Sequence, residues 1–372
     1  PASSNRAASH PVSTPAARRE LAGTRAAAHF QQMTPAIFGI AGTALGADER
    51  AFFKDADPAG YILFARNCES KDQLRALTDE LRAIHGRDRL VISIDQEGGR
   101  VARMKPPVWQ AYPAGEAFAA LWDVAPASAI EAARANAEAM GRELATMGVT
   151  VDFHAPFDVR RPETDDVIGD RALGSDPLQV AALGRAVLDG LGRAGVVGCL
   201  KHMPGHGRAT CDSHKELPHV AASDAELEVD IEPFRTLAAH PLGMSAHIVF
   251  EAWDATVPAT LSETVVRDII RGRIGFDGLL LTDDIDMQAL DGTIAERSRR
   301  ALAAGCDIVL NCWARMEDQQ AIADLGKTMS DQSARRLERV HAAMHPPSDG
   351  PDTDELLAKR DALLALAEKR AA

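Results

Sequence analysis

The sequence has few cysteines, and none is spaced as in a disulfide framework or a metal site. The cysteines number five, mostly lie inside apolar runs, and form no CxxC pair; they are Cys68, Cys199, Cys211, Cys306 and Cys312. Such thiols are typical of buried, reduced side chains in a cytosolic protein. We therefore expect a cytoplasmic protein.

Long apolar runs and an excess of positive charge are also absent. No apolar run approaches the roughly 20 residues that a helix needs to span a bilayer. The formal net charge is -13, whereas nucleic acids and anionic membranes bind basic surfaces. The charge therefore argues against both as partners. We expect the partner to be a small-molecule substrate. We expect a monomer.

Nucleotide-binding loops are missing as well. No GxGxxG motif follows the first expected strand, and there is no Walker A loop. The pair Gly98-Gly99 follows the third expected strand and lacks the spacing of a dinucleotide-binding turn. We expect neither a cofactor nor a resident metal.

The two ends of the chain differ in composition from its middle. Residues 1–32 are rich in Ala, Ser, Pro and Arg and contain few large apolar residues, which predicts a disordered leader. Met33 stands just before the first expected strand, so the natural chain is hypothesised to start there. Residues 346–372 begin with a Pro-rich breaker and continue as an amphipathic pattern, which predicts a linker and a C-terminal helix.

Short apolar runs alternate with helical patterns across residues 33–345. Helices are expected over Lys71–Ile84, Pro126–Met147 and Pro177–Ala194. A chain of 372 residues can form one large α/β barrel or two ordinary domains, and eight repeats favour a single (β/α)8 TIM-type barrel. The expected strands are Ala36–Ile40, Gly60–Phe64, Leu90–Ile94, Val149–Phe153, Val197–Leu200, Leu242–Ala246, Gly278–Thr282 and Asp307–Leu310.

Chemically capable side chains follow these strands. Active sites of such barrels lie at the carboxyl ends of the strands, so one rim is expected to collect them. These residues are Asp95, His154, Lys201, His202, His247, Asp283, Asp284 and Asn311.

The densest group of ionisable residues lies after the fifth expected strand. The segment Lys201–Gly207 reads KHMPGHG, and Asp212, Ser213 and His214 follow it closely. Two glycines and a proline exclude a regular helix. Because buried charge is costly unless it is paired, this density indicates a functional loop rather than core. A polar turn with hydrogen-bonded histidines is the plainer alternative.

These residues together resemble glycoside hydrolase family 3, and within it the single-domain bacterial β-N-acetylglucosaminidases of cell-wall recycling. The resemblance runs in order from about Pro35 to about Asn311. It rests on IDQEGGRV from Ile94, VIGDR from Val167, the loop from Lys201 to His214, and TDD from Thr282.

The resemblance implies that Asp283 is the catalytic nucleophile. Asp283 ends an apolar strand, so its carboxylate is expected to be fixed at the barrel mouth. The alternative is that Asp283 caps the next helix, a role for which Asp284 and Asp286 are further candidates.

The second catalytic group is implied to be His214, paired with Asp212, in place of the usual carboxylic acid. An imidazole titrates near neutrality, so it can donate a proton to the leaving oxygen and later accept one from water. A neighbouring aspartate would orient the ring. A metal ligand or a loop hydrogen-bonder is the alternative for His214, and His206 is interpreted as a residue that organises the loop.

Other matched positions are implied to bind the sugar. Each also has a structural alternative: Arg171 paired with Asp170 or Asp166, and Lys201 paired with Asp95. An ion pair between Glu97 and Arg100 is expected to support the site. The implied sugar-binding residues are Asp95, Arg103, Arg171, Lys201 and His202.

The function implied is that of a retaining exo-β-N-acetylglucosaminidase acting on peptidoglycan fragments, the anhydro-muropeptides. A β-N-acetylglucosaminide phosphorylase and a chitooligosaccharide-specific hydrolase remain alternatives. A more distant one is a metal-dependent TIM-barrel hydrolase with His202, His206, Asp212 and His214 as ligands, although Pro204-Gly205 breaks the helix that a His-x3-His site needs.

Overall fold

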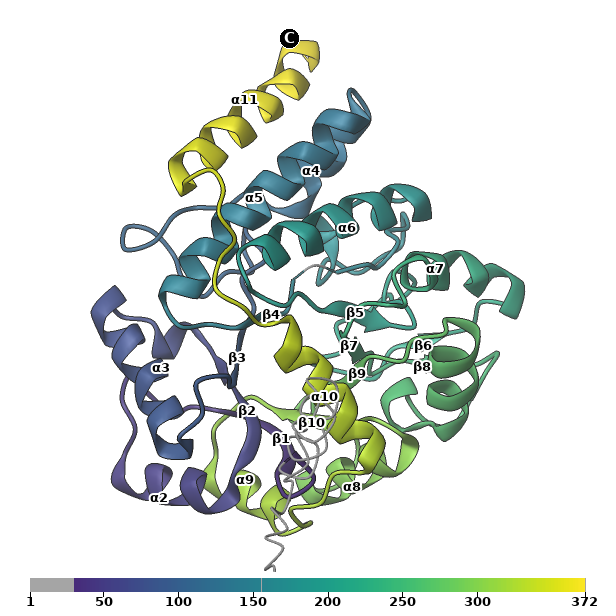
Figure 1. Cartoon of the computed structure of the whole chain (residues 1–372). Helices are drawn as coiled ribbons and strands as arrows, with labels where there is room; N and C mark the ends of the chain where they lie inside the picture. Colours follow the sequence, from purple (N-terminus) through teal and green to yellow (C-terminus); the bar gives the residue numbers. More distant parts are fainter. Residues whose placement is uncertain (1–29, 155, 372) are drawn as a thin grey trace, which may run out of the picture.

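A computed structural model of the chain describes residues 30–154 and 156–371. Its centre is a sheet of eight parallel strands surrounded by helices (Figure 1). The order of the strands in the sheet is β4-β3-β2-β1-β10-β9-β7-β5. The strands are β1 Thr34–Gly39, β2 Pro58–Leu63, β3 Val91–Ile94, β4 Val151–Asp152, β5 Leu200–Met203, β7 Leu242–Ser245, β9 Leu279–Asp284 and β10 Ile308–Asn311.

Backbone hydrogen bonds join the two ends of this sheet. The amide of Asp152 in β4 donates to the carbonyl of Val197 at 2.9 Å, and the amide of Phe157 donates to the carbonyl of Lys201 in β5 at 2.6 Å. These bonds close the sheet into the predicted (β/α)8 barrel. A separate parallel pair, β6 His219–Val220 and β8 Val249–Phe250, lies outside it.

Successive residues of each strand face opposite sides of the barrel wall. Ile37 and Leu279 belong to the apolar cluster inside the barrel, whereas Phe38 and Leu280 belong to the larger cluster beneath the helices. Both faces of the sheet are therefore buried away from solvent, which explains why the strands are continuously apolar in sequence.

Helices cover the outside of the barrel, and their ends follow from local chemistry. The Asp176 side chain accepts hydrogen bonds from the first turn of α6, and Gly86 ends α3 at φ 59°. No helix in the described part of the chain is long and apolar enough to cross a membrane. The helices are α2 Ala47–Ala56, α3 Lys71–His85, α4 Gly115–Trp122, α5 Pro126–Thr146, α6 Pro177–Arg193, α7 Asp224–Thr236, the π-helix η4 Val265–Arg273, α8 Ile294–Ala304, α9 Met316–Ala323, α10 Asp331–Ala343 and α11 Thr353–Ala371, with short 3₁₀ turns η1 Ala65–Asn67, η2 Gly169–Arg171 and η3 Ala259–Leu261.

The fifth strand differs from its prediction. β5 begins at Leu200 and includes Lys201 and His202, which were expected to follow the strand. Ionisable residues can occupy this buried strand because each has a carboxylate partner, Glu97 for Lys201 and Asp158 for His202.

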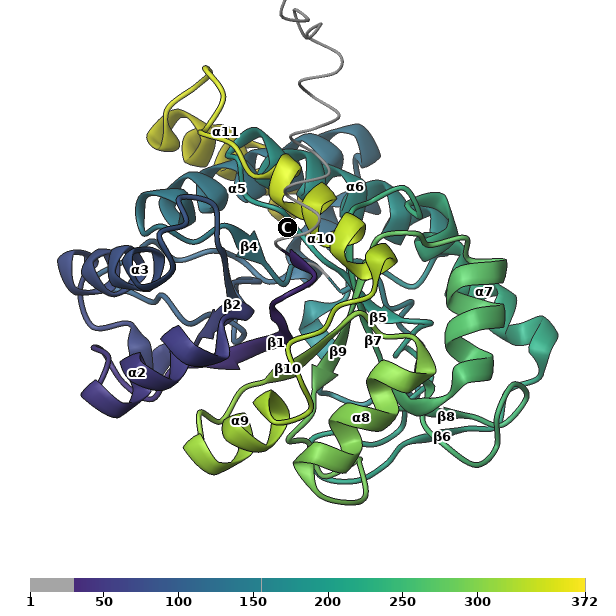
Figure 2. The same cartoon turned by 60° about the horizontal axis from the view of Figure 1, so that its bottom comes forward.

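The amino-terminal end of the barrel is closed by α10, which crosses it in both views (Figures 1 and 2). Leu337 and Val340 of α10 belong to the apolar cluster inside the barrel, and so does Phe30. The Phe30 ring lies 4.9 Å from that of His341. The predicted disorder is therefore wrong for Phe30, which packs with the barrel; residues 1–29 of the predicted leader lie outside the described part.

The predicted C-terminal helix is α11, which lies beside α4 and α5 (Figure 1). The Lys359 ammonium lies 2.9 Å from the Glu131 carboxylate of α5, and the Arg360 guanidinium donates to the Asn136 side chain at 3.2 Å. These contacts attach α11 to the outer layer of helices, far from the strand ends.

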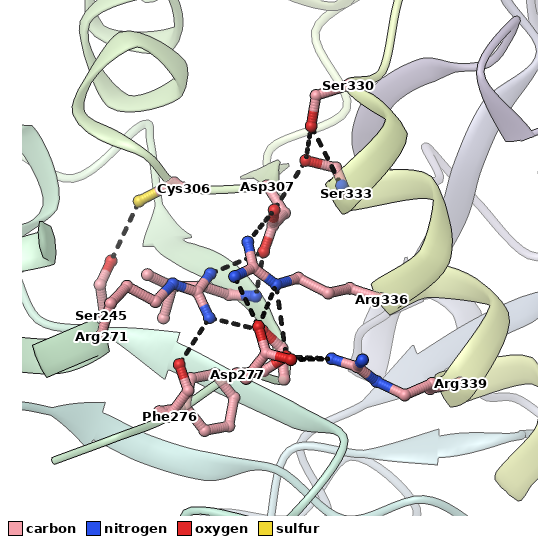
Figure 3. Close-up of polar contacts among 12 residues, drawn as sticks. Ser245, Arg271, Phe276, Asp277, Cys306, Asp307, Ser330, Ser333, Arg336 and Arg339 are labelled. Carbon is pink, nitrogen blue, oxygen red and sulfur yellow. Dashed lines mark hydrogen bonds and ion pairs between the residues drawn. The ribbon is translucent and has the colours of Figure 1, made fainter.

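A buried ion cluster fastens α10 to the barrel (Figure 3). Asp307, just before β10, accepts hydrogen bonds from Arg271 at 2.8 Å and from Arg336 of α10 at 3.0 Å. Its carboxylate also accepts from Ser333 of α10 at 2.7 Å. Arg336 pairs in addition with Asp277, which is 66% exposed. One buried carboxylate therefore joins two guanidinium groups at this end.

We expect Asp307→Asn to lower the free energy of unfolding by about 3 kcal/mol, because it leaves two guanidinium groups without the charge between them. Asp277→Asn, which removes an exposed partner of the same arginine, should cost less than about 1 kcal/mol. Urea unfolding of both variants measures the difference. Equal losses would show that the buried carboxylate has no special role.

Candidate active site

The predicted site residues gather at the carboxyl ends of the strands. Asp95 follows β3, Lys201 and His202 lie in β5, and Asp283 lies near the end of β9. In the closed ring of eight strands, β3 and β9 are four positions apart and thus lie opposite each other. Asp95 and Asp283 therefore face each other across the barrel mouth.

A buried lysine lies between two carboxylates on one side of the mouth. The Lys201 ammonium is 2.6 Å from Glu97 Oε1 and 3.2 Å from Asp95 Oδ1. Burial acts to lower the pKa of Lys201, but Glu97 and Asp95 raise it above its usual value. Burial acts to raise the pKa of Asp95, but Lys201 and Arg103 bring it below its usual value. All three groups are therefore held charged.

Two arginines complete this cluster. Arg171 binds Glu97 through two hydrogen bonds of 2.8 Å each, and Arg103 donates to Asp95 Oδ2 at 3.0 Å. The expected Glu97–Arg100 pair is wrong, because Arg100 pairs with Asp170 at 2.6 Å. The carboxylate that pairs with Arg171 is therefore Glu97 rather than Asp170 or Asp166.

Asp158 holds the start of the loop after β5, and sequence reasoning missed it. Its Oδ2 lies 2.8 Å from His202 Nδ1, and its Oδ1 accepts from the amide of His206 at 2.6 Å. His206 Nε2 in turn lies 3.3 Å from Ser213 Oγ, which fits its predicted organising role. Burial acts to raise the pKa of Asp158, but His202 lowers it below its usual value. The sequence did offer one signal for a buried role of Asp158, because it is a single acid between the apolar residues Phe157 and Val159.

The predicted pair of His214 and Asp212 is formed. His214 Nδ1 lies 2.8 Å from Asp212 Oδ1, which also accepts from the His214 amide at 2.9 Å. Burial acts to raise the pKa of Asp212, but its bonds to His214 and Lys215 lower it. Since Nδ1 is used by the carboxylate, Nε2 is the ring nitrogen left to face a substrate. The His214 side chain is 62% exposed.

Asp283 is held as an ionised carboxylate. Its Oδ1 accepts from the amide of Asp284 at 2.8 Å. Burial acts to raise the pKa of Asp283, but His202, His247 and His214, with that amide, lower it to about 2. A carboxylate that stays unprotonated is suited to act as a nucleophile.

The helix-cap alternative for Asp283 is wrong. The next helix, α8, is capped by the side chain of Thr293, so neither Asp284 nor Asp286 caps it. Asp284 Oδ1 accepts instead from the amides of Asp286 and Cys312, each at 3.2 Å. These two aspartates tie the segment after β9 to the segment after β10.

The histidines are arranged as hydrogen-bonding groups. Among the described residues, no three His, Cys, Asp or Glu side chains converge as metal ligands do. His202, His206 and His214 each contact a different partner: Asp158, Ser213 and Asp212. The rings of His202 and His206 lie 5.5 Å apart, but the four residues considered for a metal-dependent hydrolase do not converge on one point within the described part.

Comparison with known proteins agrees with this geometry. Residues 30–343 match the glycosyl hydrolase family 3 N-terminal domain. A beta-hexosaminidase of Chromobacterium violaceum is 39% identical over 344 residues, covering 90% of this chain and 93% of that protein. The structure of NagZ from Neisseria gonorrhoeae in complex with N-trifluoroacetyl-D-glucosamine is similar, with a TM-score of 0.79 and 32% identity over 90% of this chain and 98% of that one.

The chain belongs to glycosyl hydrolase family 3. It is a glycoside hydrolase of the β-N-acetylhexosaminidase kind, as its relatives and its fold together establish. The predicted family, fold and enzyme class are confirmed. The roles of the individual site residues stay predictions.

The pKa of Asp283 generates a prediction about pH. Since its carboxylate is ionised above about pH 2, the acidic limb of kcat/KM that reports its protonation should lie well below pH 4. After burial, the interaction with His202 has the largest effect on the pKa of Asp283 and lowers it, so His202→Gln should move this limb to higher pH.

The dependence of kcat/KM on pH is measured with an activated aryl N-acetyl-β-glucosaminide. Circular dichroism shows whether the protein is folded at each pH. His240→Gln is the control, because that ring bonds to the carbonyl of Gly198 and is not among the groups that act on Asp283. An acidic limb that stays in place in His202→Gln would contradict the assignment.

Proposed function

We propose that the enzyme is a retaining exo-β-N-acetylglucosaminidase that removes the terminal N-acetylglucosamine from peptidoglycan fragments. The observation that carries this proposal is that one structure contains both an ionised Asp283 at the mouth and a hydrogen-bonded pair of His214 and Asp212 on the loop after β5. A retaining enzyme needs these two groups, a nucleophile and an acid/base residue.

In the first step, a carboxylate oxygen of Asp283 attacks the anomeric carbon as the bond to the leaving oxygen breaks. His214 Nε2 donates its proton to that oxygen, and Asp212 stabilises the ring through Nδ1. The products are a glycosyl-enzyme ester and a free alcohol, with His214 neutral.

In the second step, neutral His214 takes a proton from water, and the resulting hydroxyl group attacks the anomeric carbon. The ester bond to Asp283 breaks and the carboxylate is restored. Each step inverts the anomeric carbon, so the sugar leaves with its original configuration.

The cluster on the opposite side supplies the specificity. Asp95, Lys201 and Arg103 are paired with one another but keep hydrogen-bonding capacity for sugar hydroxyl groups, and a substrate without the matching group forgoes those bonds. The neisserial relative binds an N-acylated glucosamine, which supports an N-acetylamino sugar in this position.

Phosphate is the alternative acceptor in the second step. A neutral histidine repels phosphate less than a carboxylate would. A positive charge also lies in the same loop, because the Lys215 ammonium is 3.3 Å from Asp212. Product analysis with and without phosphate decides between the two: free sugar supports hydrolysis, and sugar 1-phosphate supports phosphorolysis. A chitooligosaccharide is the alternative substrate to a peptidoglycan fragment.

We further propose that the enzyme acts as a cytoplasmic monomer. All five cysteines are free thiols, which fits a reducing compartment. Sedimentation analysis and cell fractionation test these two statements. A stable dimer or a secreted enzyme would contradict them.

The proposed specificity predicts that β-glucosides are poor substrates. Without the acetamido group, a substrate forgoes contacts expected near Lys201, His202 and Arg171, so we expect kcat/KM to fall by about 100-fold or more. The measurement compares a chromogenic N-acetyl-β-glucosaminide with the glucoside that carries the same leaving group. Comparable values for the two would overturn the proposal.

A further inference from the structure

An exposed tryptophan stands on the loop between β10 and α9. Trp313 is 60% exposed, and Met316 in the same segment is also exposed. Six large apolar residues of the described part are at least 37% exposed, and two of them are Trp313 in this loop and Met316 at the start of α9. A tryptophan left in water forgoes a large burial energy, which makes this loop a candidate for ligand contact.

The loop is fixed to the segment that carries the nucleophile. The amide of Trp313 donates to Asp286 Oδ2 at 3.3 Å, and the amide of Cys312 donates to the same oxygen at 3.2 Å. Ala314 then adopts a left-handed conformation with φ 56°, unusual for a residue with a side chain. Trp313 therefore has a defined place on the rim, one strand away from Asp283.

The position of this rim follows from the ring of strands. β9 lies opposite β3 and beside β10. If Asp95 holds the hydroxyl groups of the terminal sugar and Asp283 faces its anomeric carbon, the leaving group extends beyond β9, away from β3. This step rests on the proposed function. The rim beyond β9 includes the segment of Trp313.

We propose that Trp313 is the platform on which a sugar ring of the leaving group stacks. A pyranose presents a face of C–H bonds, which an aromatic face can bury. The Arg315 guanidinium lies 5.7 Å from the centre of the Trp313 ring, and its partner Asp318 lies 3.6 Å away. The arginine steadies one face of the ring through a cation–π contact, so the other face is the one that receives the sugar.

This platform complements the rest of the mouth. Asp95, Glu97, Lys201 and Arg171 recognise polar groups and are already paired with one another. Stacking needs no matched hydrogen-bonding group, so it accepts leaving sugars with different substituents. Trp313 is thus assigned as a specificity-determining residue, separate from the groups that perform the reaction.

The test compares two substrates that share the terminal N-acetylglucosamine. One is N,N′-diacetylchitobiose, whose leaving group is a sugar ring, and the other is methyl N-acetyl-β-glucosaminide, whose leaving group has no ring. Trp313→Ala should lower kcat/KM for the disaccharide about tenfold, the value of burying part of one aromatic face. For the methyl glycoside, kcat/KM should change by less than about twofold.

Trp313→Phe keeps an aromatic face and should retain most of the preference for the disaccharide. Leu178→Ala, which truncates an exposed apolar residue at the start of α6, is the control and should change neither value. Equal losses on both substrates in Trp313→Ala would overturn the platform, because they would indicate a disturbed nucleophile segment. No loss on the disaccharide would overturn it as well.

Failure of the proposed function gives a different result. In that case the wild-type enzyme would hydrolyse neither substrate, whereas failure of the platform alone leaves the wild-type activity on both intact.

Discussion

The contact of Lys201 with Glu97 and Asp95 is the interaction on which the active site depends. The lysine side chain is only 2% exposed, and a buried charge is tolerated only when it is paired and hydrogen-bonded. Its two partners belong to the segment after β3, while the lysine belongs to β5. One ammonium group thereby joins two parts of the rim that are more than 100 residues apart in sequence. It lowers the pKa of Asp95, and together with Arg171 it lowers that of Glu97.

A second set of contacts builds outward from the same strand. His202, beside Lys201, is held by Asp158, which also fixes the start of the loop through the amide of His206. That loop carries Asp212 and His214 toward the mouth, where His202 and His214 both lower the pKa of Asp283. Asp283 therefore owes its ionised state to histidines of other strands and loops as well as to the amide of Asp284 beside it in β9.

The barrel was predictable because its strands are apolar on both faces and its helices carry clear start and stop signals. The rim residues were predictable because parallel strands place their ends together. The predictions that failed concerned which side chains pair with each other. Glu97 was expected to pair with its near neighbour Arg100, but the partner of Glu97 is Arg171, 74 residues away. Asp158 was missed because its contacts with His202 and His206 span 44 and 48 residues. Side-chain pairing over such separations is set by the closed barrel rather than by local pattern, and Lys201 and His202 were likewise placed after β5 instead of within it.

The central claim is that Asp283 and His214 divide the reaction between them, one as nucleophile and one as acid/base group. Single-turnover rates of glycosylation for His214→Ala, on N-acetyl-β-glucosaminides whose leaving groups range from acidic phenols to alcohols, test it most directly. A phenol of low pKa departs without a proton, so the variant should keep much of its rate there and lose about 100-fold or more on an alcohol. Asp212→Ala should give a milder version of the same trend. Equal impairment across all leaving groups would contradict the claim and place the acid elsewhere.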